Sequence, residues 1–197
     1  RQRQMCIRDR DRTMTTVQQL YEAMQRIAPL ELAEHWDNPG LLVDCAGEVT
    51  RVLVTLDITP EVVAEAAAKH CEAIVAHHPV IFDPLKKLGP QDVPFQLVQA
   101  GISAICMHTN LDAAEGGVND QLARALGLTD TIPLNEQKIG RIGTLSCEKP
   151  LEQFLHDVVK SLGCRGLRYR SGGRPVRRVA VGGGACGEYI PQALAQG

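Results

Sequence analysis

The chain has 197 residues, of which 44% are hydrophobic and 22% are charged, and its 21 Lys and Arg against 23 Asp and Glu give a net charge of −2. Because a domain holds roughly 100–200 residues, the length predicts one large domain or two small ones. The near-neutral charge argues against a nucleic-acid partner bound through bulk basic charge. No apolar run approaches the roughly 18 residues of a membrane span, and no secretion signal is recognisable. Seven widely spaced cysteines without a CxxC pair fit a reducing compartment, so we expect a cytoplasmic protein with no membrane partner.

The first thirteen residues differ in composition from the rest of the chain. They read RQRQMCIRDRDRT, with five Arg and no hydrophobic periodicity, and Met14 follows as a plausible initiator. We interpret residues 1–13 as a non-native prefix, and the alternative is a natural disordered basic arm. Without this prefix the net charge becomes −5, from 16 basic and 21 acidic residues.

Strands and helices alternate in the first part of the chain. Apolar spacing predicts a helix from Val17 that ends before Pro29, and caps and turn residues delimit the elements that follow. These are a strand at 51–57, a helix from Thr59 to about His70, a strand at 73–76, a helix at 94–100 closed by Gly101, a strand at 102–107 and a helix at 116–126. Such alternation is typical of βαβ units around a mostly parallel sheet. The fold class is therefore α/β, and the carboxyl ends of the parallel strands should share one edge of the sheet.

The pattern changes after Leu128. Residues 129–138 are polar and predict a linker, and they are followed by strands at 139–145, 164–169 and 176–181 and a helix at 151–162. We therefore expect two α/β domains of the three-layer type, one over 14–128 and a smaller one over 129–197.

The sharpest chemical feature is His77-His78-Pro79, directly after the strand at 73–76. Neighbouring residues of a regular strand point to opposite sides, so the two imidazoles should not bind one ion but can each serve a different one. Neutral imidazole suits divalent ions such as Zn, Fe, Ni or Mn. A solvent-facing or structural histidine pair is the alternative interpretation.

The next parallel strand leads into His108-Thr109-Asn110-Leu111-Asp112. The carboxylate of Asp112 could bridge two cations about 3.5–4 Å apart, the geometry of two-metal hydrolytic sites. A turn or helix-cap carboxylate is the other interpretation. Because His77, His78, His108 and Asp112 all fall at strand ends on one edge, their convergence favours a metal site.

Three further segments leave two interpretations open. The segment Trp36–Gly40 holds the single Trp and is either a tight turn with a core Trp or a loop that closes over the sheet edge. Gly182–Gly187 matches GxGxxG after a strand, which suggests a phosphate loop or a close-packed strand–helix turn. A run of arginines is either a solvated strand face or an anion-binding rim: Arg165, Arg168, Arg170, Arg174, Arg177 and Arg178.

Four blocks of the sequence resemble one known family. They are WDNPGLLVD (36–44), VTLDITPEVVAEA (54–66), IVAHHPVIFDPLKKL (74–88) and MHTNLDAAEGGVN (107–119), and they are similar to the Nif-three-like dinuclear-metal hexameric proteins, many of which are called GTP cyclohydrolase I type 2 homologues. The resemblance runs from about Met14 to the end of the chain. It implies a toroidal homohexamer with two divalent metal ions, whose identity among Zn, Fe, Mn, Ni and Mg it leaves open.

Carried onto this chain, the resemblance assigns the metal ligands. It implies that His77 and His78 bind separate ions and that Asp112 is the bridging carboxylate, while His108 has a supporting place beside them. Family members supply further ligands, a His and a Glu, from a GHxxxE-like stretch that is absent after Gly187 here. The second domain is therefore expected to be truncated before that segment.

Three functions follow from these expectations. The first is a dinuclear metal-dependent hydrolase that converts GTP to dihydroneopterin triphosphate and formate, with the arginine run, through Arg168 and Arg170, as candidate contacts to the triphosphate. The second is a non-enzymatic metal-binding ring scaffold or metal-handling protein. The third, which ranks last, is a nucleotide-binding regulator that uses Gly182–Gly187.

Overall fold

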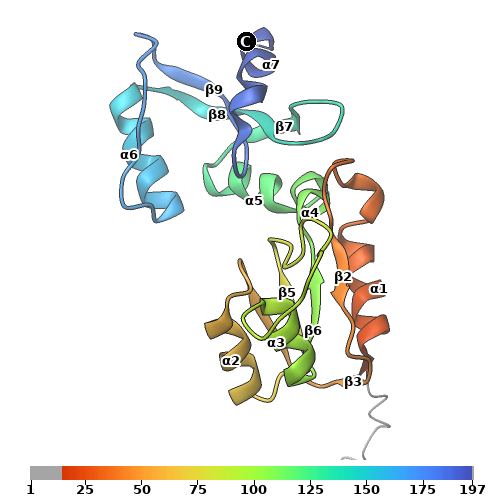
Figure 1. Cartoon of the computed structure of the whole chain (residues 1–197). Helices are drawn as coiled ribbons and strands as arrows, with labels where there is room; N and C mark the ends of the chain where they lie inside the picture. The colour runs from red at the N-terminus through yellow and green to blue at the C-terminus, as the bar shows by residue number, and fades with distance from the viewer. Residues whose placement is uncertain (1–14, 197) are drawn as a thin grey trace, which may run out of the picture. The chain divides into compact units, whose positions relative to one another are not determined.

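The computed structural model describes residues 15–196, so the proposed prefix 1–13 lies outside the described residues (Figure 1). The elements of the first half, in chain order, are β1 (Thr15–Thr16), α1 (Val17–Ile27), the 3-10 helix η1 (Leu30–Leu32), β2 (Gly40–Val43), β3 (Glu48–Val49), β4 (Val52–Thr55), α2 (Pro60–Ala68), β5 (Ala73–Ala76), α3 (Val93–Ala100) and β6 (Ser103–Cys106). Those of the second half are α4 (Thr109–Ala113), α5 (Val118–Ala125), β7 (Thr129–Pro133), β8 (Arg141–Lys149), α6 (Leu151–Leu162), β9 (Val176–Val181), the 3-10 helix η2 (Cys186–Tyr189) and α7 (Ile190–Ala195). The chain is a mixed α/β protein, as predicted.

The chain divides into two compact units. Among the described residues, one unit contains 15–23 and Gly40–Cys106, and the other contains Met24–Pro39 and 107–196. This division falls at a different place from the predicted boundary at 128/129. The reason is that α5 packs against β8 of the second sheet. Helix α4 packs against α5 and against η1, so it belongs to the same unit.

The first unit is built around a four-stranded sheet with the order β2-β6-β5-β4. Strands β4, β5 and β6 are parallel, and β2 is antiparallel to β6. Both central strands, β5 and β6, are buried at every position, as expected of parallel strands with both faces covered. Figure 1 shows α2 and α3 beside this sheet.

Neighbouring residues of β5 serve two cores on opposite faces of that sheet. Ile74 packs with Val63 of α2 and Leu97 of α3, whereas Ala73 packs with Val17 of α1. The first unit therefore has three layers, with helices on both sides of its sheet.

Local signals define the helices of the first unit. The Thr59 hydroxyl accepts a hydrogen bond from Val62 N at 3.3 Å, which caps α2, and Pro60 occupies the first turn as predicted. At the end of α3, Gly101 has φ of 69°, a left-handed conformation that glycine adopts without steric cost.

The second unit contains a three-stranded antiparallel sheet with the order β7-β8-β9. One face is covered by α5 and α6 through Ala123, Leu145 and Phe154. Two sequence predictions fail here. The expected linker 129–138 begins with β7, an edge strand exposed at all five positions, and the expected strand 164–169 forms no strand. Strand β7 forms because its backbone pairs with β8, and this pairing does not depend on apolar side chains. In the described chain, segment 164–169 pairs with no strand.

Candidate metal centre

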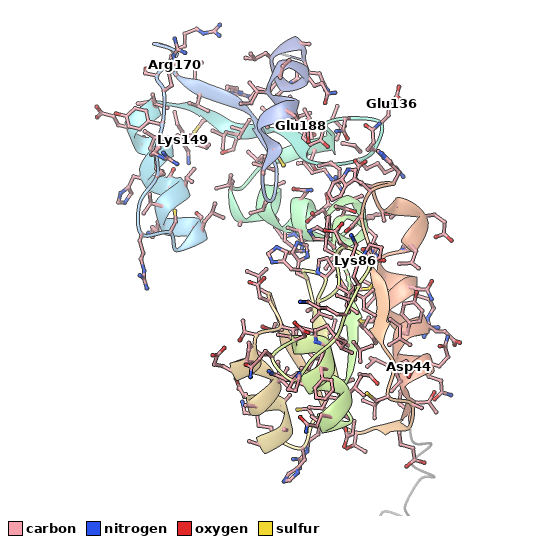
Figure 2. All side chains as sticks on the ribbon, in the orientation of Figure 1. Asp44, Lys86, Glu136, Lys149, Arg170 and Glu188 are labelled. Atoms are coloured by element: carbon pink, nitrogen blue, oxygen red, sulfur yellow. The ribbon has the colours of Figure 1, made fainter. Side chains whose placement is uncertain are left out.

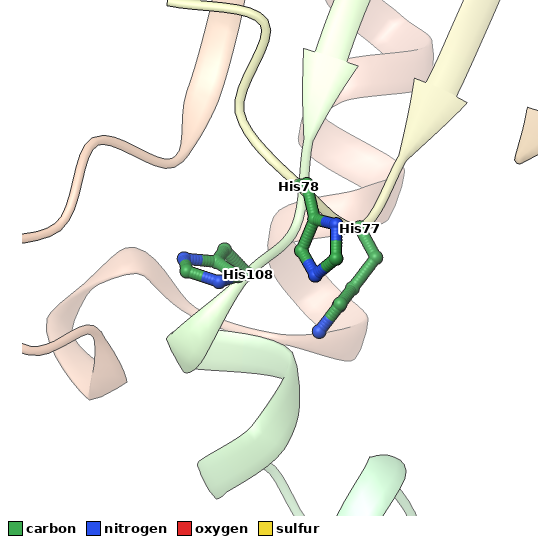
Figure 3. Close-up of side chains that lie close together, drawn as sticks. All are labelled: His77, His78 and His108. Atoms are coloured by element: carbon green, nitrogen blue, oxygen red, sulfur yellow. The ribbon is translucent and has the colours of Figure 1, made fainter. Parts of the chain in front are cut away.

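Three histidines gather just beyond the carboxyl ends of β5 and β6. His77 and His78 follow β5 directly, and His108 lies two residues after β6. The two strands pair in parallel with Ala76 opposite Cys106, so the chain leaves both of them at the same edge. One ring nitrogen from each histidine lies within 4.8 Å of the others (Figure 3). Three imidazoles form a donor set that transition-metal ions favour, so this histidine cluster could bind a metal ion.

His77 and His78 do not diverge as the sequence pattern predicted. Their ring centroids are 5.1 Å apart with the planes tilted by 46°. In a regular strand successive N–H groups point to opposite sides, but His77 N donates to Thr55 O at 3.2 Å and His78 N donates to Leu56 O at 3.0 Å, both toward the β4 side. The strand alternation therefore ends at Ala76, and both rings can approach the same place.

The spacing of the histidine cluster limits how it can hold ions. Two imidazole nitrogens on one Zn²⁺, each at about 2.0–2.1 Å, lie at most about 4.2 Å apart. The ligand nitrogens of the cluster all lie within 4.8 Å of one another, which is compatible with one shared ion or with two neighbouring ions. The donor types and their convergence fit a metal ion.

The His108 ring is held by the buried carboxylate of Asp37. Asp37 Oδ1 lies 2.7 Å from His108 Nδ1, and Asp37 Oδ2 accepts hydrogen bonds from Thr109 N at 3.0 Å and Thr109 Oγ1 at 2.5 Å. The side chain of Asp37 is completely buried and that of His108 is 18% exposed. A carboxylate at Nδ1 keeps the proton on that nitrogen, so the lone pair of Nε2 is the one available to a metal.

The same contacts shift the pKa of both partners. Burial by itself would raise the pKa of Asp37, but the hydrogen bonds from His108, Thr109 and Asn38 outweigh it and lower that pKa to about 2. The hydrogen bond to Asp37 is the largest cause that raises the pKa of His108; burial opposes it, and the charges of Asp37 and Asp112 reinforce it. Both pKa shifts therefore share one source, the contact between the Asp37 carboxylate and the His108 ring.

A second carboxylate holds His78. Asp57 Oδ1 lies 2.6 Å from His78 Nδ1, and both side chains are about half exposed. Asp57 follows β4, the strand next to β5, so the parallel sheet brings the two residues to one edge. Two of the three clustered histidines therefore have a carboxylate at Nδ1, the arrangement that orients histidine ligands in many metal sites.

Asp112 lies on α4, a short helix that the sequence pattern did not predict. Its side chain is buried, its backbone oxygen accepts a hydrogen bond from Asn119 Nδ2 at 3.0 Å, and its charge raises the pKa of His108. The group of ligand atoms that lie within 4.8 Å of one another contains His77, His78 and His108. The bridging role of Asp112 stays a prediction, and His108, expected only as a supporting residue, joins the cluster itself.

Sequence reasoning did not single out Asp37, because the segment Trp36–Gly40 was interpreted only as a whole, either as a tight turn or as a loop over the sheet edge. Trp36, beside it, is not a core residue, since it is 52% exposed. The one available signal was that Asp37 lies in WDNPGLLVD, one of the four blocks that carry the family resemblance, and had no role assigned to it. A contact between residues 71 positions apart leaves no local pattern.

The residues of the glycine-rich loop and of the arginine run are not part of the histidine cluster. Gly183 N donates to Asn119 Oδ1 at 2.8 Å, and a Cβ at Gly183 would come within 3.2 Å of Val118, which agrees with a close-packed strand–helix turn. Arg168 and Arg170 are exposed on the loop between α6 and β9, where Figure 2 labels Arg170. Their proposed contact with a triphosphate stays a prediction. Among residues 15–196, no helix is long and apolar enough to cross a membrane.

Fold and cluster together define a mixed α/β protein with a candidate metal centre at the carboxyl ends of its parallel strands. A family model described as Duf34/NIF3 (NGG1p interacting factor 3) matches residues 15–197, and the chain belongs to this family.

Relatives and solved structures agree with this assignment. A Lactococcus lactis protein named GTP cyclohydrolase 1 type 2 homolog is 36% identical over 180 residues, covering 86% of this chain and 70% of that protein. The NGG1-interacting factor 3 of Saccharomyces cerevisiae is 40% identical over 129 residues, covering 58% of this chain and 45% of the yeast protein. The crystal structure of a hypothetical protein of Staphylococcus aureus has a TM-score of 0.85 and 30% identity, covering 93% of this chain and 77% of that one. The predicted resemblance is thereby confirmed at the level of the family.

Proposed function

We propose that the protein is a metal-dependent hydrolase of the cyclohydrolase type, with its metal held by the histidine cluster. The observation that carries this proposal is the convergence of His77, His78 and His108 within 4.8 Å, with carboxylates behind two of them. His78 and His108 already have Nδ1 beside a carboxylate oxygen. Held so, the rings keep one tautomer and spend little conformational entropy when they take up a ligand.

A bound divalent ion would lower the pKa of a coordinated water and polarise the bond to be hydrolysed. The protein's own contribution is the orientation of the rings. Asp37 fixes His108, Asp57 fixes His78, and Cys106 Sγ donates to the backbone oxygen of His77 at 3.1 Å, which tethers the start of the His77–His78 segment to the next strand.

We further propose two ions and a bridging role for Asp112. The support for two ions is the resemblance described above, in which His77 and His78 serve separate ions, together with ligand nitrogens that lie within 4.8 Å of one another. The carboxylate of Asp112 is close enough to raise the pKa of His108. In this proposal His77 and His78 bind different ions.

GTP is the substrate that this proposal favours. The Lactococcus lactis relative is named a GTP cyclohydrolase 1 type 2 homolog, and this name supports hydrolytic opening of the guanine imidazole ring, with dihydroneopterin triphosphate and formate as products. The exposed guanidinium groups of Arg168 and Arg170 are proposed to contact the triphosphate. A homohexamer is proposed on the resemblance alone, and native mass spectrometry of the purified chain tests it.

The test compares His77→Ala with His156→Ala, an exposed histidine on α6 outside the cluster. Both proteins are loaded with Zn²⁺ or Mn²⁺, their metal content is measured after gel filtration, and GTP turnover is followed by the fluorescent pterin that forms on oxidation of the product. We expect His77→Ala to lose both metal and turnover, while His156→Ala retains both.

Each result separates the proposal from its rival. Metal binding that depends on His77 without turnover of GTP or other cyclic amides would favour a non-enzymatic metal-binding scaffold. Turnover that survives His77→Ala would contradict the proposed site.

A further inference from the structure

The single Trp of the chain is exposed beside the histidine cluster. Trp36 is 52% exposed, although large aromatic side chains are usually well buried because their burial contributes so much to stability. Its ring centroid lies 6.4 Å from that of His108, with the two planes at 78°. The two rings therefore meet edge to face and do not form a parallel stack.

The segment that carries Trp36 is firmly anchored. The next residue, Asp37, is buried and bonded to His108 and Thr109, and Asp37 N donates to Glu34 O at 3.0 Å. Glu34 N in turn donates to Thr109 Oγ1 at 3.0 Å. The backbone on both sides of Trp36 is thus tied to His108 and Thr109 at the start of α4, and the Trp36 side chain is 52% exposed.

An exposed aromatic ring on a fixed turn is well suited to bind another flat ring. Stacking needs a rigid, solvent-accessible π-face, and it tolerates different bases because every base has such a face. The 6.4 Å separation from His108 means that a ring stacked on Trp36 lies next to that histidine. The surface of the indole therefore provides ring recognition close to the candidate metal centre.

We propose that Trp36 is the stacking residue of the substrate site and that it recognises the planar heteroaromatic ring of a purine nucleotide. This inference rests on the proposed function, because it assigns the ring to the same substrate. It assigns two separate roles within the site: the indole of Trp36 binds the base, and the histidine cluster holds the metal ion that acts on the base.

The sequence makes this inference simple to test, because Trp36 is the only Trp and intrinsic tryptophan fluorescence reports on this one residue. Guanosine, GTP and inorganic tripolyphosphate are titrated into the Zn²⁺-loaded chain. We expect saturable quenching by guanosine and GTP, because both carry the ring, and none by tripolyphosphate, which carries only the charge.

Variants then separate ring stacking from structure. Trp36→Leu should weaken guanosine binding, measured by equilibrium dialysis, by about 5- to 150-fold, the usual range for loss of one base–aromatic stack. Trp36→Phe keeps an aromatic face and should retain most of the affinity. Tyr169→Leu removes an aromatic ring that is 63% exposed elsewhere in the second unit, and it should leave guanosine binding unchanged.

Metal content distinguishes failure of this inference from failure of the proposed function. Trp36→Leu should still bind as much Zn²⁺ as the parent chain, because Trp36 supplies no ligand. Guanosine affinity that is unchanged in Trp36→Leu, or quenching by tripolyphosphate equal to that by GTP, would overturn the stacking role even if His77→Ala abolishes metal binding. Loss of Zn²⁺ in both Trp36→Leu and Trp36→Phe would also overturn it, since the residue would then act by supporting Asp37 and His108.

Discussion

The two carboxylate–histidine pairs of the candidate metal centre have the same chemistry but different surroundings. The Asp37 side chain is completely buried and that of His108 is 18% exposed, and the Asp37 carboxylate takes part in four hydrogen bonds. Asp57 and His78 are 57% and 46% exposed, so water competes for the same atoms. The comparison indicates that Asp37 holds His108 more firmly than Asp57 holds His78.

The largest expected effect comes from removing the buried carboxylate. Asp37→Ala leaves His108 Nδ1, Thr109 N and Asn38 N without their acceptor, and each unsatisfied buried group costs about 1–3 kcal/mol. Allowing for water entering the vacated space, we expect a loss of about 3 kcal/mol in the free energy of unfolding, measured by urea denaturation.

Asp57→Ala is the matched control. An exposed pair contributes about 0–1 kcal/mol, so its loss should lower the free energy of unfolding by less than about 1 kcal/mol. Equal effects of the two substitutions would show that burial does not distinguish the pairs.

A second buried contact extends the comparison beyond the histidines. In the second unit the guanidinium of Arg141 is 6% exposed and pairs with Asp120, and it also donates to the backbone oxygens of Ala113 and Ala114 at the end of α4. Burial alone would raise the pKa of Asp120, but the hydrogen bonds from Arg141 and Gly116 outweigh it and lower that pKa. This pair is therefore expected to contribute to stability in a pH-dependent way.

Asp120→Asn should lower the free energy of unfolding by about 2 kcal/mol at neutral pH, as expected when a hydrogen bond to a charged group is weakened. Because the pKa of Asp120 is lower in the folded than in the unfolded state, its charge stabilises the fold above the ordinary Asp pKa of about 4. That contribution is lost as the pH falls below about 4 and through the lowered folded-state pKa. Urea denaturation of both proteins between neutral and acidic pH measures this, and a difference that does not shrink on acidification would contradict it.

Local signals predicted the elements, while long-range contacts decided the site. Strand β5, α6 and β9 were predicted at their observed residues, because their apolar patterns and the flanking Gly and Pro residues are local. The edge strand β7 was not predicted, since it exists only through its pairing with β8. The positions of His77, His78 and His108 followed from the shared edge of a parallel sheet. The approach of the His77 and His78 rings depends on the end of the strand alternation at Ala76, which no local sequence pattern predicts.

The two carboxylate–histidine pairs also depend on long-range contacts that local sequence patterns do not predict. Asp37 joins His108 across 71 residues of sequence, and Asp57 joins His78 across 21. Asp57 was predicted only as the last residue of the strand at 51–57, and Asp37 only as part of a segment that was either a turn or a loop over the sheet edge. Without the tertiary fold, a carboxylate that orients a histidine looks the same as any other surface carboxylate.

The smallest expected effect comes from an ion pair on the surface of the first unit. Glu65 and Lys69 lie four residues apart at the end of α2, with side chains 51% and 62% exposed. The hydrogen bond to Glu65 is the main cause that raises the pKa of Lys69, yet water solvates both groups almost as well when they are apart. Glu65→Gln should therefore leave the midpoint of thermal unfolding unchanged within experimental error, whereas Asp120→Asn lowers it. A shift for Glu65→Gln as large as that for Asp120→Asn would mean that contact geometry, rather than burial, decides which charged pairs stabilise this protein, and the contrast between its two carboxylate–histidine pairs would have to be explained without solvent exposure.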